Sequence, residues 1–186
     1  MSEKQYNILM VGGNSRKAGK TELICRLLEN FGKEYSIAAV KVALYGDRDI
    51  FRGHYPQASE AGYLEIKENN PRLMKDSGKY LAAGAAESWF LVSITDNEEK
   101  VVQKIMEISN HVNLMIVESN ALRSNLEPGI FVMVNKRGKE QKQSAKAVSS
   151  CADLIVETGG EMFRHIERYI KIDNHTWNLK KRYDIF

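Results

Sequence analysis

The sequence is poor in several residue types and patterns that mark particular protein classes. It has only two cysteines and three prolines in 186 residues. Cys25 and Cys151 are far apart and show no CxxC or other metal-binding spacing, so we expect two reduced thiols that pack in the interior. No pair among the four histidines has a metal-ligand spacing, which argues against a zinc site.

Strong charge and long hydrophobic runs are absent as well. Lysine and arginine number 27 against 24 acidic residues, a balance too even to indicate a nucleic-acid-binding protein. No apolar run reaches the roughly 20 residues that a membrane span needs. The first five residues are polar and contain no apolar signal-peptide core. We therefore expect a cytoplasmic protein that binds neither nucleic acid nor membrane.

What the sequence does contain is an alternation of short apolar runs and amphipathic stretches. Apolar runs typical of buried strands lie at 6–11, 36–42, 88–94, 113–118, 130–134 and 154–156. Stretches typical of helices lie at 21–31, 73–86, 144–152 and 162–172, and a capping box at 95–98 opens another that carries apolar residues to 108. Residues 43–56 read as a loop, and 58–70 are ambiguous between helix and strand. The pattern predicts an α/β fold whose mostly parallel sheet has helices on both faces.

The length and composition fit one domain, which we place at residues 1–172. Residues 173–186 form a C-terminal tail that contains Trp177 and several basic residues. This tail is either mobile or a strap that docks on the domain.

A phosphate-binding loop joins the first strand to the first helix. Its sequence, Gly-Gly-Asn-Ser-Arg-Lys-Ala-Gly-Lys-Thr at 12–21, departs from GxxxxGK[ST] because Asn14 stands at the first glycine position. Backbone amides and the helix N-terminus attract phosphate, Lys20 neutralises β/γ-phosphate charge, and the Thr21 hydroxyl suits Mg²⁺. The loop predicts a three-layer P-loop NTPase fold. The predicted nucleotide-binding residues are Gly13, Asn14, Ser15, Arg16, Lys17, Ala18, Gly19, Lys20 and Thr21.

A P-loop Mg²⁺ usually needs a carboxylate at the end of a neighbouring apolar strand. Glu118 ends the apolar run at 113–118 and is the first choice for binding Mg²⁺ or positioning water. Asp47, in the loop after the second strand, is the second choice of metal ligand. Lys20 and Glu118 are the residues that we expect to act in any hydrolysis.

The base site is less well defined. Asn135 and Lys136 end a later strand and match the first two positions of the guanine-binding pattern NKxD. Gly138 stands where that pattern has its aspartate. Asn135 is therefore predicted to contact the base, while the choice between GTP and ATP stays open.

Two family resemblances refine this prediction. Five residues separate the loop glycines Gly13 and Gly19, and this spacing resembles the dethiobiotin synthetase and cobyrinic acid a,c-diamide synthase branch of P-loop proteins. Lys-Asp-Ser at 75–77 followed by Ala-Gly-Ala at 83–85 resembles the molybdopterin-guanine dinucleotide biosynthesis protein B family, the MobB family. The order of P-loop, this segment and the strand that ends in Glu118 also agrees with the MobB family. The loops after Lys41 and after Glu118 depart from it.

The MobB resemblance implies an α/β homodimer that binds GTP with Mg²⁺ and hydrolyses it slowly. Such a protein would assist a molybdenum cofactor nucleotidyltransferase, or bind a pterin. The second resemblance implies instead an ATP-dependent ligase, in which Lys20 and Lys41 stabilise a phosphoryl group in transfer to a substrate acid. A third possibility is a nucleotide-switched partner-binding protein. For the segment at 75–85 two readings stay open: Asp76 and Ser77 face a ligand across from the P-loop, or Asp76 only caps a helix and the small residues only allow close packing.

Overall fold

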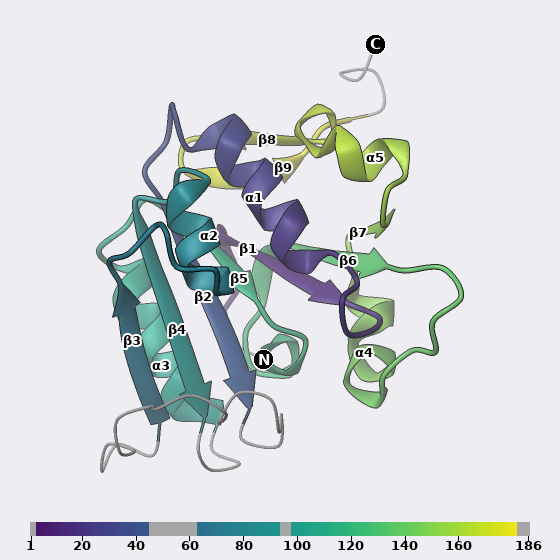
Figure 1. The fold of residues 1–186 in the computed structure, drawn as a ribbon, viewed down its shortest axis with the longest axis horizontal. Coiled ribbons are helices and arrows are strands. Elements are labelled where there is room, and N and C mark those ends of the chain that lie inside the picture. The colour runs from purple at the N-terminus through teal and green to yellow at the C-terminus, as the bar shows by residue number, and fades with distance from the viewer. Residues whose placement is uncertain (1–2, 45–62, 94–97, 182–186) are drawn as a thin grey trace.

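The computed structural model describes residues 3–44, 63–93 and 98–181 (Figure 1). Within them, nine strands and five α-helices alternate along the chain, with three short 3-10 helices between them. The strands are β1 (Gln5–Gly13), β2 (Ile37–Leu44), β3 (Tyr63–Glu68), β4 (Glu87–Ser93), β5 (Leu114–Glu118), β6 (Pro128–Asn135), β7 (Leu154–Glu157), β8 (Ile170–Asp173) and β9 (Thr176–Leu179). The helices are α1 (Lys20–Phe31), α2 (Asp76–Ala82), α3 (Glu98–Ser109), α4 (Gln143–Val148) and α5 (Glu161–Arg164), with 3-10 helices η2 (Ala121–Ser124), η3 (Ser149–Cys151) and η4 (Ile166–Arg168).

In this part of the chain seven strands form one sheet in the order β3-β4-β2-β5-β1-β6-β7. All neighbours are parallel except β3, which runs antiparallel to β4 at one edge. The carboxyl ends of the parallel strands therefore meet along one rim, where ligands bind in such folds. The strand β5, which ends in Glu118, lies directly between β1 and β2, and this order places the predicted carboxylate beside the phosphate loop.

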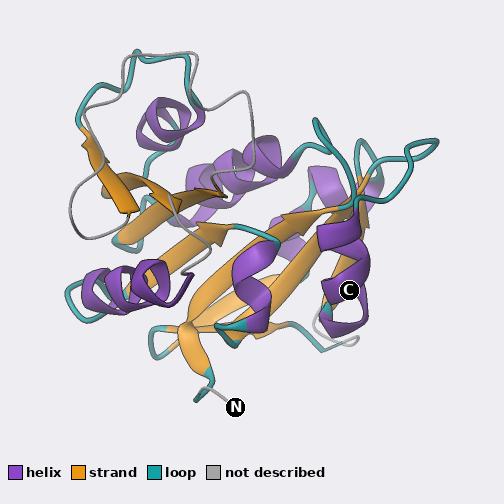
Figure 2. Ribbon diagram, turned by 90° about the horizontal axis from the view of Figure 1, so that it is seen from below, coloured by secondary structure: helices purple, strands orange, loops and turns teal. Residues whose placement is uncertain are grey.

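Helices cover both faces of the sheet (Figure 2). On β1, Leu9 and Val11 belong to one buried cluster, and Ile8 and Met10 to the other, as expected for a strand that is covered on both sides. The first cluster packs under α1, α2, α5, η4 and the β8–β9 hairpin. The second packs under α3, η2 and α4. The predicted three-layer α/β fold is confirmed.

Two predicted helices are shorter in the structure. The helix expected at 73–86 is α2, which has seven residues and is followed by Gly84 in the left-handed conformation (φ 107°). The ambiguous segment 58–70 contains β3, with residues 58–62 outside the described ranges. The helix expected at 144–152 is α4 followed by η3. Most of the predicted loop 43–56 and the first three residues of the capping box also lie outside the described ranges.

The last predicted helix, 162–172, is helical only as far as α5 and η4, and the prediction is wrong from Ile170 onward. Phe163, Ile166 and Ile170 have helical spacing, but they reach the core from α5, η4 and β8 in turn. Residues Ile170–Asp173 pair with β9 across a two-residue turn, in which Asn174 and His175 both have positive φ (48° and 56°). Such a turn matches the twist of a hairpin and removes these residues from a helix.

The β8–β9 hairpin spans residue 172, where the sequence places the end of the domain. Trp177 on β9 is fully buried, its ring lies edge-on to Phe31, and its indole N–H donates to the carbonyl oxygens of Asn7 (3.1 Å) and Met115 (3.2 Å). Residues 176–179 therefore dock on the sheet. Among the described helices, none combines the length and apolarity that crossing a bilayer requires.

Candidate functional site

The phosphate loop begins where β1 ends, at Gly13, and closes where α1 begins, at Lys20. Two of its residues have positive φ, Lys17 (57°) and Gly19 (94°). Gly19 also lies against the Phe163 ring, where an added Cβ would approach to 3.2 Å. A glycine therefore suits the point at which the loop turns into the helix, both for its conformation and for its small size.

Asn14 holds the loop to the end of β6. Its backbone N–H donates to Val134 O (2.9 Å), its side-chain amide donates to Lys136 O (3.1 Å), and its Oδ1 accepts from Lys136 N (3.0 Å). The side chain is only 8% exposed. The residue that stands at the first glycine position of the usual pattern thus has its side-chain amide hydrogen-bonded within the protein.

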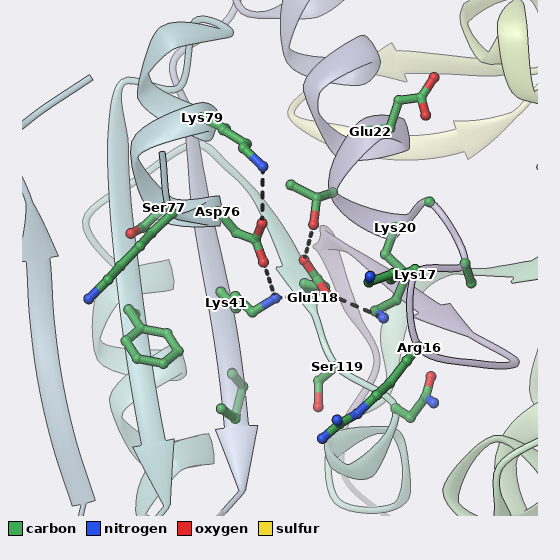
Figure 3. Close-up of a pocket in the computed structure, with 18 of the residues that line it drawn as sticks. Arg16, Lys17, Lys20, Glu22, Lys41, Asp76, Ser77, Lys79, Glu118 and Ser119 are labelled. Carbon is green, nitrogen blue, oxygen red and sulfur yellow. Dashed lines mark hydrogen bonds and ion pairs between the residues drawn. The ribbon is translucent and has the colours of Figure 1, made fainter. Parts of the chain in front are cut away.

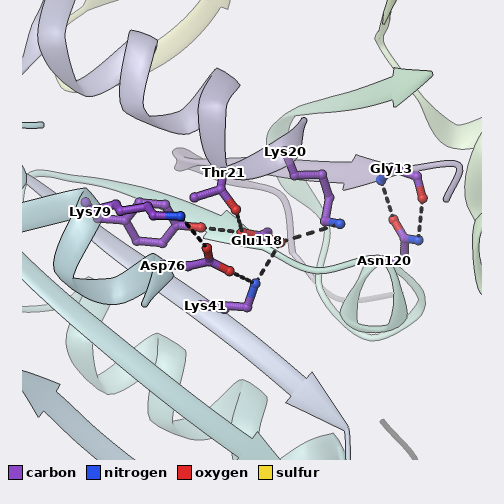
Figure 4. A network of polar contacts seen from close by, with 9 residues as sticks. Gly13, Lys20, Thr21, Lys41, Asp76, Lys79, Glu118 and Asn120 are labelled. Carbon is purple, nitrogen blue, oxygen red and sulfur yellow. Dashed lines mark hydrogen bonds and ion pairs between the residues drawn. The ribbon is translucent and has the colours of Figure 1, made fainter. Parts of the chain in front are cut away.

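Asn120 holds the loop from the other side, and sequence reasoning missed it. Its Oδ1 accepts from Gly13 N (2.8 Å) and its Nδ2 donates to Gly13 O (2.9 Å), as Figure 4 shows. A Cβ at Gly12 would lie 2.5 Å from Asn120 Oδ1, so this close approach requires glycine there. The only available signal was an amide two residues beyond Glu118, at the same rim of the sheet.

Thr158 forms a third tie. Its hydroxyl donates to Ala18 O (2.5 Å), and Asn135 O lies 3.2 Å from the same hydroxyl. The loop is thus attached to the ends of β6 and β7 and to the segment after β5. Such attachment pre-organises its backbone amides for an anion.

Glu118 lies beneath the loop and the start of α1. It is 4% exposed and stands beside Val11 in the β1–β5 register. Its Oε2 accepts a hydrogen bond from Thr21 Oγ1 (3.3 Å), and its Oε1 lies 3.5 Å from Lys20 Nζ. The three residues that the sequence assigned to phosphate, metal and catalysis are therefore brought together by the fold.

Four further residues complete this network, and Figure 4 labels three of them, Lys41, Asp76 and Lys79. Lys41 stands beside Glu118 in the β2–β5 register, and its Nζ donates to Glu118 Oε1 (3.1 Å) and to Asp76 Oδ2. Tyr80, four residues after Asp76 on α2, donates its hydroxyl to Glu118 Oε2. Lys79 Nζ lies 3.9 Å from Asp76 Oδ1. Sequence reasoning named Lys41 and Asp76 as candidates but missed Tyr80, whose i+4 spacing from Asp76 was the available signal.

The network keeps Lys41 and Asp76 ionised. Burial alone would lower the pKa of Lys41, but Glu118 and Asp76 outweigh it and raise that pKa above its ordinary value. Burial would raise the pKa of Asp76, but Lys41 outweighs it and holds that pKa below its ordinary value. Burial, with the charge of Glu118, raises the pKa of Tyr80 well above its ordinary value. Tyr80 therefore remains a hydrogen-bond donor at physiological pH.

A pocket of about 1050 Å³ opens over this network. Figure 3 shows Lys17 and Lys20 on one side of Glu118, with Asp76, Ser77 and Lys79 of α2 on the other. Among the described residues, its charged lining comprises seven basic side chains and three acidic ones: Arg16, Lys17, Lys20, Lys41, Lys75, Lys79 and Lys142, with Glu22, Asp76 and Glu118. The excess of positive charge suits a polyanion such as a triphosphate.

Some predicted residues lie elsewhere. Asp47 is outside the described residues. Asn135 does not line this pocket, although its Oδ1 is buried and has no hydrogen-bond partner within the described ranges.

The two cysteines are free thiols in different surroundings. Cys25 lines the pocket, and burial raises its pKa to about 11. Cys151 is exposed and does not pack as expected. The described residues contain no cluster of three or more His, Cys, Asp or Glu that could hold a metal by itself.

The sequence matches no protein-family model and no curated protein. Among solved structures, the kinase domain of the Escherichia coli tyrosine kinase ETK is similar in fold. The two share 13% sequence identity over 84% of this chain and 70% of that domain, with a TM-score of 0.44. Identity and score this low transfer no activity, so the function must be argued from the site itself.

Proposed function

We propose that this chain binds a nucleoside triphosphate together with Mg²⁺ in the pocket over Glu118, and hydrolyses it slowly on its own. The observation that carries the proposal is the convergence of Lys20, Thr21 and Glu118 beneath a pre-organised phosphate loop. Loop amides and Lys20 would hold the β- and γ-phosphates, as in other P-loop proteins.

The donor set suits Mg²⁺. Thr21 Oγ1 and Glu118 Oε2 are hard oxygen ligands 3.3 Å apart. Adjacent ligands of an octahedral Mg²⁺ with bonds of about 2.1 Å lie about 3 Å apart, so both oxygens can bind one ion after a small adjustment. Mg²⁺ typically takes one or two protein ligands and completes its shell with phosphates and water, which fits a site without a larger acidic cluster. When bound, the ion neutralises phosphate charge. Asp47 remains the proposed additional ligand.

Slow hydrolysis follows from how the lining carboxylates are engaged. Glu118 and Asp76 both accept from Lys41, and Glu22 pairs with Arg26 (3.0 Å). A general base needs a carboxylate that can take a proton from water. Among the described lining residues, each carboxylate is instead paired with a cation.

For the nucleotide and the biological role, we propose GTP and an accessory function in molybdenum cofactor biosynthesis, as the MobB resemblance implies. The partner would be a nucleotidyltransferase or a pterin, and the chain would act as a homodimer. Within the described residues, the buried Oδ1 of Asn135 at the end of β6 has no hydrogen-bond partner, which supports its proposed contact with the base. The resemblance carries the choice of GTP over ATP, because Gly138 stands in place of the guanine-binding aspartate.

A second candidate is an ATP-dependent ligase of the dethiobiotin synthetase type. The observation that favours it is the position of Lys41, which shares Glu118 Oε1 with Lys20. Two ammonium groups at one carboxylate oxygen can stabilise a phosphoryl group during transfer. In such an enzyme, turnover would require a small acid.

Calorimetric titration of GTP and ATP, with and without Mg²⁺, tests the proposal on the wild type, Lys20→Ala and the exposed control Lys171→Ala. We expect Mg²⁺-dependent binding that falls by about 100-fold in Lys20→Ala, because a charge-assisted contact to phosphate is lost, and is unchanged in the control. Preference for GTP supports the MobB-like role, whereas preference for ATP supports the ligase. Folded protein that binds neither nucleotide would refute the proposal.

A further inference from the structure

The hydroxyl group of Tyr80 belongs to the network around Glu118, although Tyr80 does not line the pocket above it. The residue is fully buried in the core cluster that packs under α1 and α2. A phenylalanine ring would fill the same space, whereas a buried hydroxyl is unfavourable unless it forms a hydrogen bond. The hydroxyl donates to Glu118 Oε2. Its contribution is therefore to this carboxylate rather than to the packing of the ring.

The two oxygens of Glu118 have different partners. Oε1 lies 3.1 Å from Lys41 Nζ and 3.5 Å from Lys20 Nζ. Oε2 accepts hydrogen bonds from the hydroxyl groups of Thr21 and Tyr80. A carboxylate has about four lone-pair sites, so these four donors from the described residues match its whole hydrogen-bonding capacity. A metal ion that binds Glu118 must therefore take the place of one donor.

Thr21 is the donor whose place a metal ion would take. Its Oγ1 lies 3.3 Å from Glu118 Oε2, and both atoms are ligands of the proposed Mg²⁺. For both oxygens to bind one ion, the Thr21 proton has to turn away from Oε2, while Tyr80 keeps its hydrogen bond to the same oxygen. Figure 4 shows Thr21 and Lys41 approaching Glu118 from different sides. The Tyr80 hydrogen bond and the Lys41 contact can thus both persist when the ion is bound.

These two contacts restrict how the carboxylate of Glu118 can turn. To bring both oxygens to one ion, the group would have to rotate away from Tyr80 on Oε2 and from Lys41 on Oε1. Mg²⁺ requires a small, near-ideal octahedral shell, whereas the larger and more flexible shell of Ca²⁺ also accepts carboxylates through both oxygens. A carboxylate that is held to offer one oxygen therefore suits Mg²⁺ better than Ca²⁺.

We propose that Tyr80 is a positioning residue of the metal site, whose hydroxyl holds Glu118 so that Oε2 alone faces the ion, which favours Mg²⁺ over Ca²⁺. This inference rests on the proposed nucleotide site. The hydroxyl comes from α2, whereas the proposed ligands Thr21 and Glu118 come from α1 and β5. Removing a group that hydrogen-bonds to a metal ligand typically lowers metal affinity by about 10–100-fold.

The test is calorimetric titration of the full chain with β,γ-imido GTP, and in parallel with β,γ-imido ATP, in excess Mg²⁺, in excess Ca²⁺ and in EDTA. Tyr80→Phe keeps the ring and removes the hydroxyl. We expect the affinity for the analogue in Mg²⁺ to fall by about tenfold, because the metal ligand loses its support. The affinities in Ca²⁺ and in EDTA should stay within about twofold of the wild type, since neither depends on binding through one oxygen. A purely structural hydroxyl would change all three affinities alike, or none.

Tyr35→Phe is the matched control. Tyr35 packs against the same core cluster and does not line the pocket, so its hydroxyl should be dispensable in all three conditions.

A second measurement needs no variant, and it decides the matter even if Tyr80→Phe does not fold. Infrared difference spectra of the wild type, labelled with ¹³C at the glutamate carboxyl groups, compare the analogue-bound protein with and without Mg²⁺. The two carboxylate stretching bands lie further apart when one oxygen binds the ion than when both do. We expect the wide separation for the glutamate bands that change with Mg²⁺.

The outcomes separate the inference from the function on which it rests. A Mg²⁺ preference that falls in Tyr80→Phe, with the wide band separation in the wild type, supports the inference. Unchanged affinities, an equal fall in all three conditions, or a narrow band separation overturns it and leaves the nucleotide site in place. Wild-type protein that does not bind either analogue, or binds equally in Mg²⁺ and in EDTA, counts against the proposed function instead.

Discussion

At the scale of single residues, the Glu118 carboxylate organises the site. It is buried, and a buried charge is strongly unfavourable unless it is paired and hydrogen-bonded. Lys20 and Lys41 contact one of its oxygens, and Thr21 and Tyr80 donate to the other. These four donors come from α1, β2 and α2, so the carboxylate has all of them as partners only in the folded protein. Glu118 and Thr21 both line the pocket, where we place the proposed Mg²⁺.

The ion pair between Lys41 and Asp76 makes stability depend on pH. The folded-state pKa of Asp76 is lowered, so its contribution is present above the ordinary value of 3.8 and is lost as pH falls through the folded-state pKa. The pKa of Lys41 is raised, so its contribution is present below 10.5 and is lost as pH rises through the folded-state value. Asp76→Asn should lower the free energy of unfolding by about 1–3 kcal/mol at neutral pH, since both side chains are partly exposed.

Urea denaturation at a series of pH values checks this expectation. The difference between wild type and Asp76→Asn should shrink as the pH falls below 3.8. Glu140→Gln, at an exposed position, serves as the control and should change little. A difference between wild type and Asp76→Asn that does not change with pH would contradict the assignment.

At the scale of elements, α2 is a helix of only seven residues that carries three members of the network: Asp76, Lys79 and Tyr80. Gly78 lies in its middle, where glycine is normally unfavourable. An added Cβ would lie 2.3 Å from Leu73 O, so the chain before the helix passes too close for any side chain. The glycine thereby sets the position of α2, and with it the positions of Asp76 and Tyr80.

Gly78→Ala should therefore displace the start of α2 and lower the free energy of unfolding by about 1–3 kcal/mol, as overpacking does. The Mg²⁺-dependent affinity for nucleotide should fall as well, because Tyr80 and Asp76 move with the helix. Chemical denaturation and calorimetry measure the two effects. Gly138→Ala is the control, because Gly138 also has positive φ (68°) but has open space around it. This variant should lower the free energy of unfolding by about 1 kcal/mol, the penalty of positive φ alone, and should leave nucleotide affinity unchanged. Equal effects of the two variants on affinity would contradict this role for α2.

At the scale of the whole molecule, the β8–β9 hairpin closes one face of the sheet (Figure 1). Trp177 is its anchor, because it is fully buried and donates to carbonyl groups of β1 and β5. These are the two strands whose far ends carry the phosphate loop and Glu118. The hairpin thus supports, from the opposite end, the part of the sheet that positions the site.

Trp177→Ala should lower the free energy of unfolding by about 3–5 kcal/mol, the range for removing a buried aromatic side chain. Urea denaturation followed by circular dichroism measures the loss. Lys171→Ala, an exposed substitution on the same hairpin, should stay within about 0.5 kcal/mol of the wild type. A small effect of Trp177→Ala would mean that the hairpin contributes little to the fold.

The sequence by itself determined the alternation of strands and helices, the three-layer fold and the place of the phosphate loop. These features are local: periodicity within one strand or helix, and a glycine-rich turn between β1 and α1, are visible in neighbouring residues. Glu118 and Lys41 were also accessible to sequence reasoning, because each lies in or at the end of an apolar run whose carboxyl end faces the rim of a parallel sheet.

Only the tertiary structure decided which side chains meet there. Asn120, Thr158 and Tyr80 reach the loop or Glu118 across large sequence separations. The local signals for Asn120 and Tyr80, an amide two residues after Glu118 and a spacing of four from Asp76, do not specify which residues they contact. The final segment shows the same limit: Ile166 and Ile170 have helical spacing, yet pairing between β8 and β9 and the burial of Trp177 override it. Local periodicity predicts that a side chain is buried. The strand order and the packing of distant elements determine which residues it packs against.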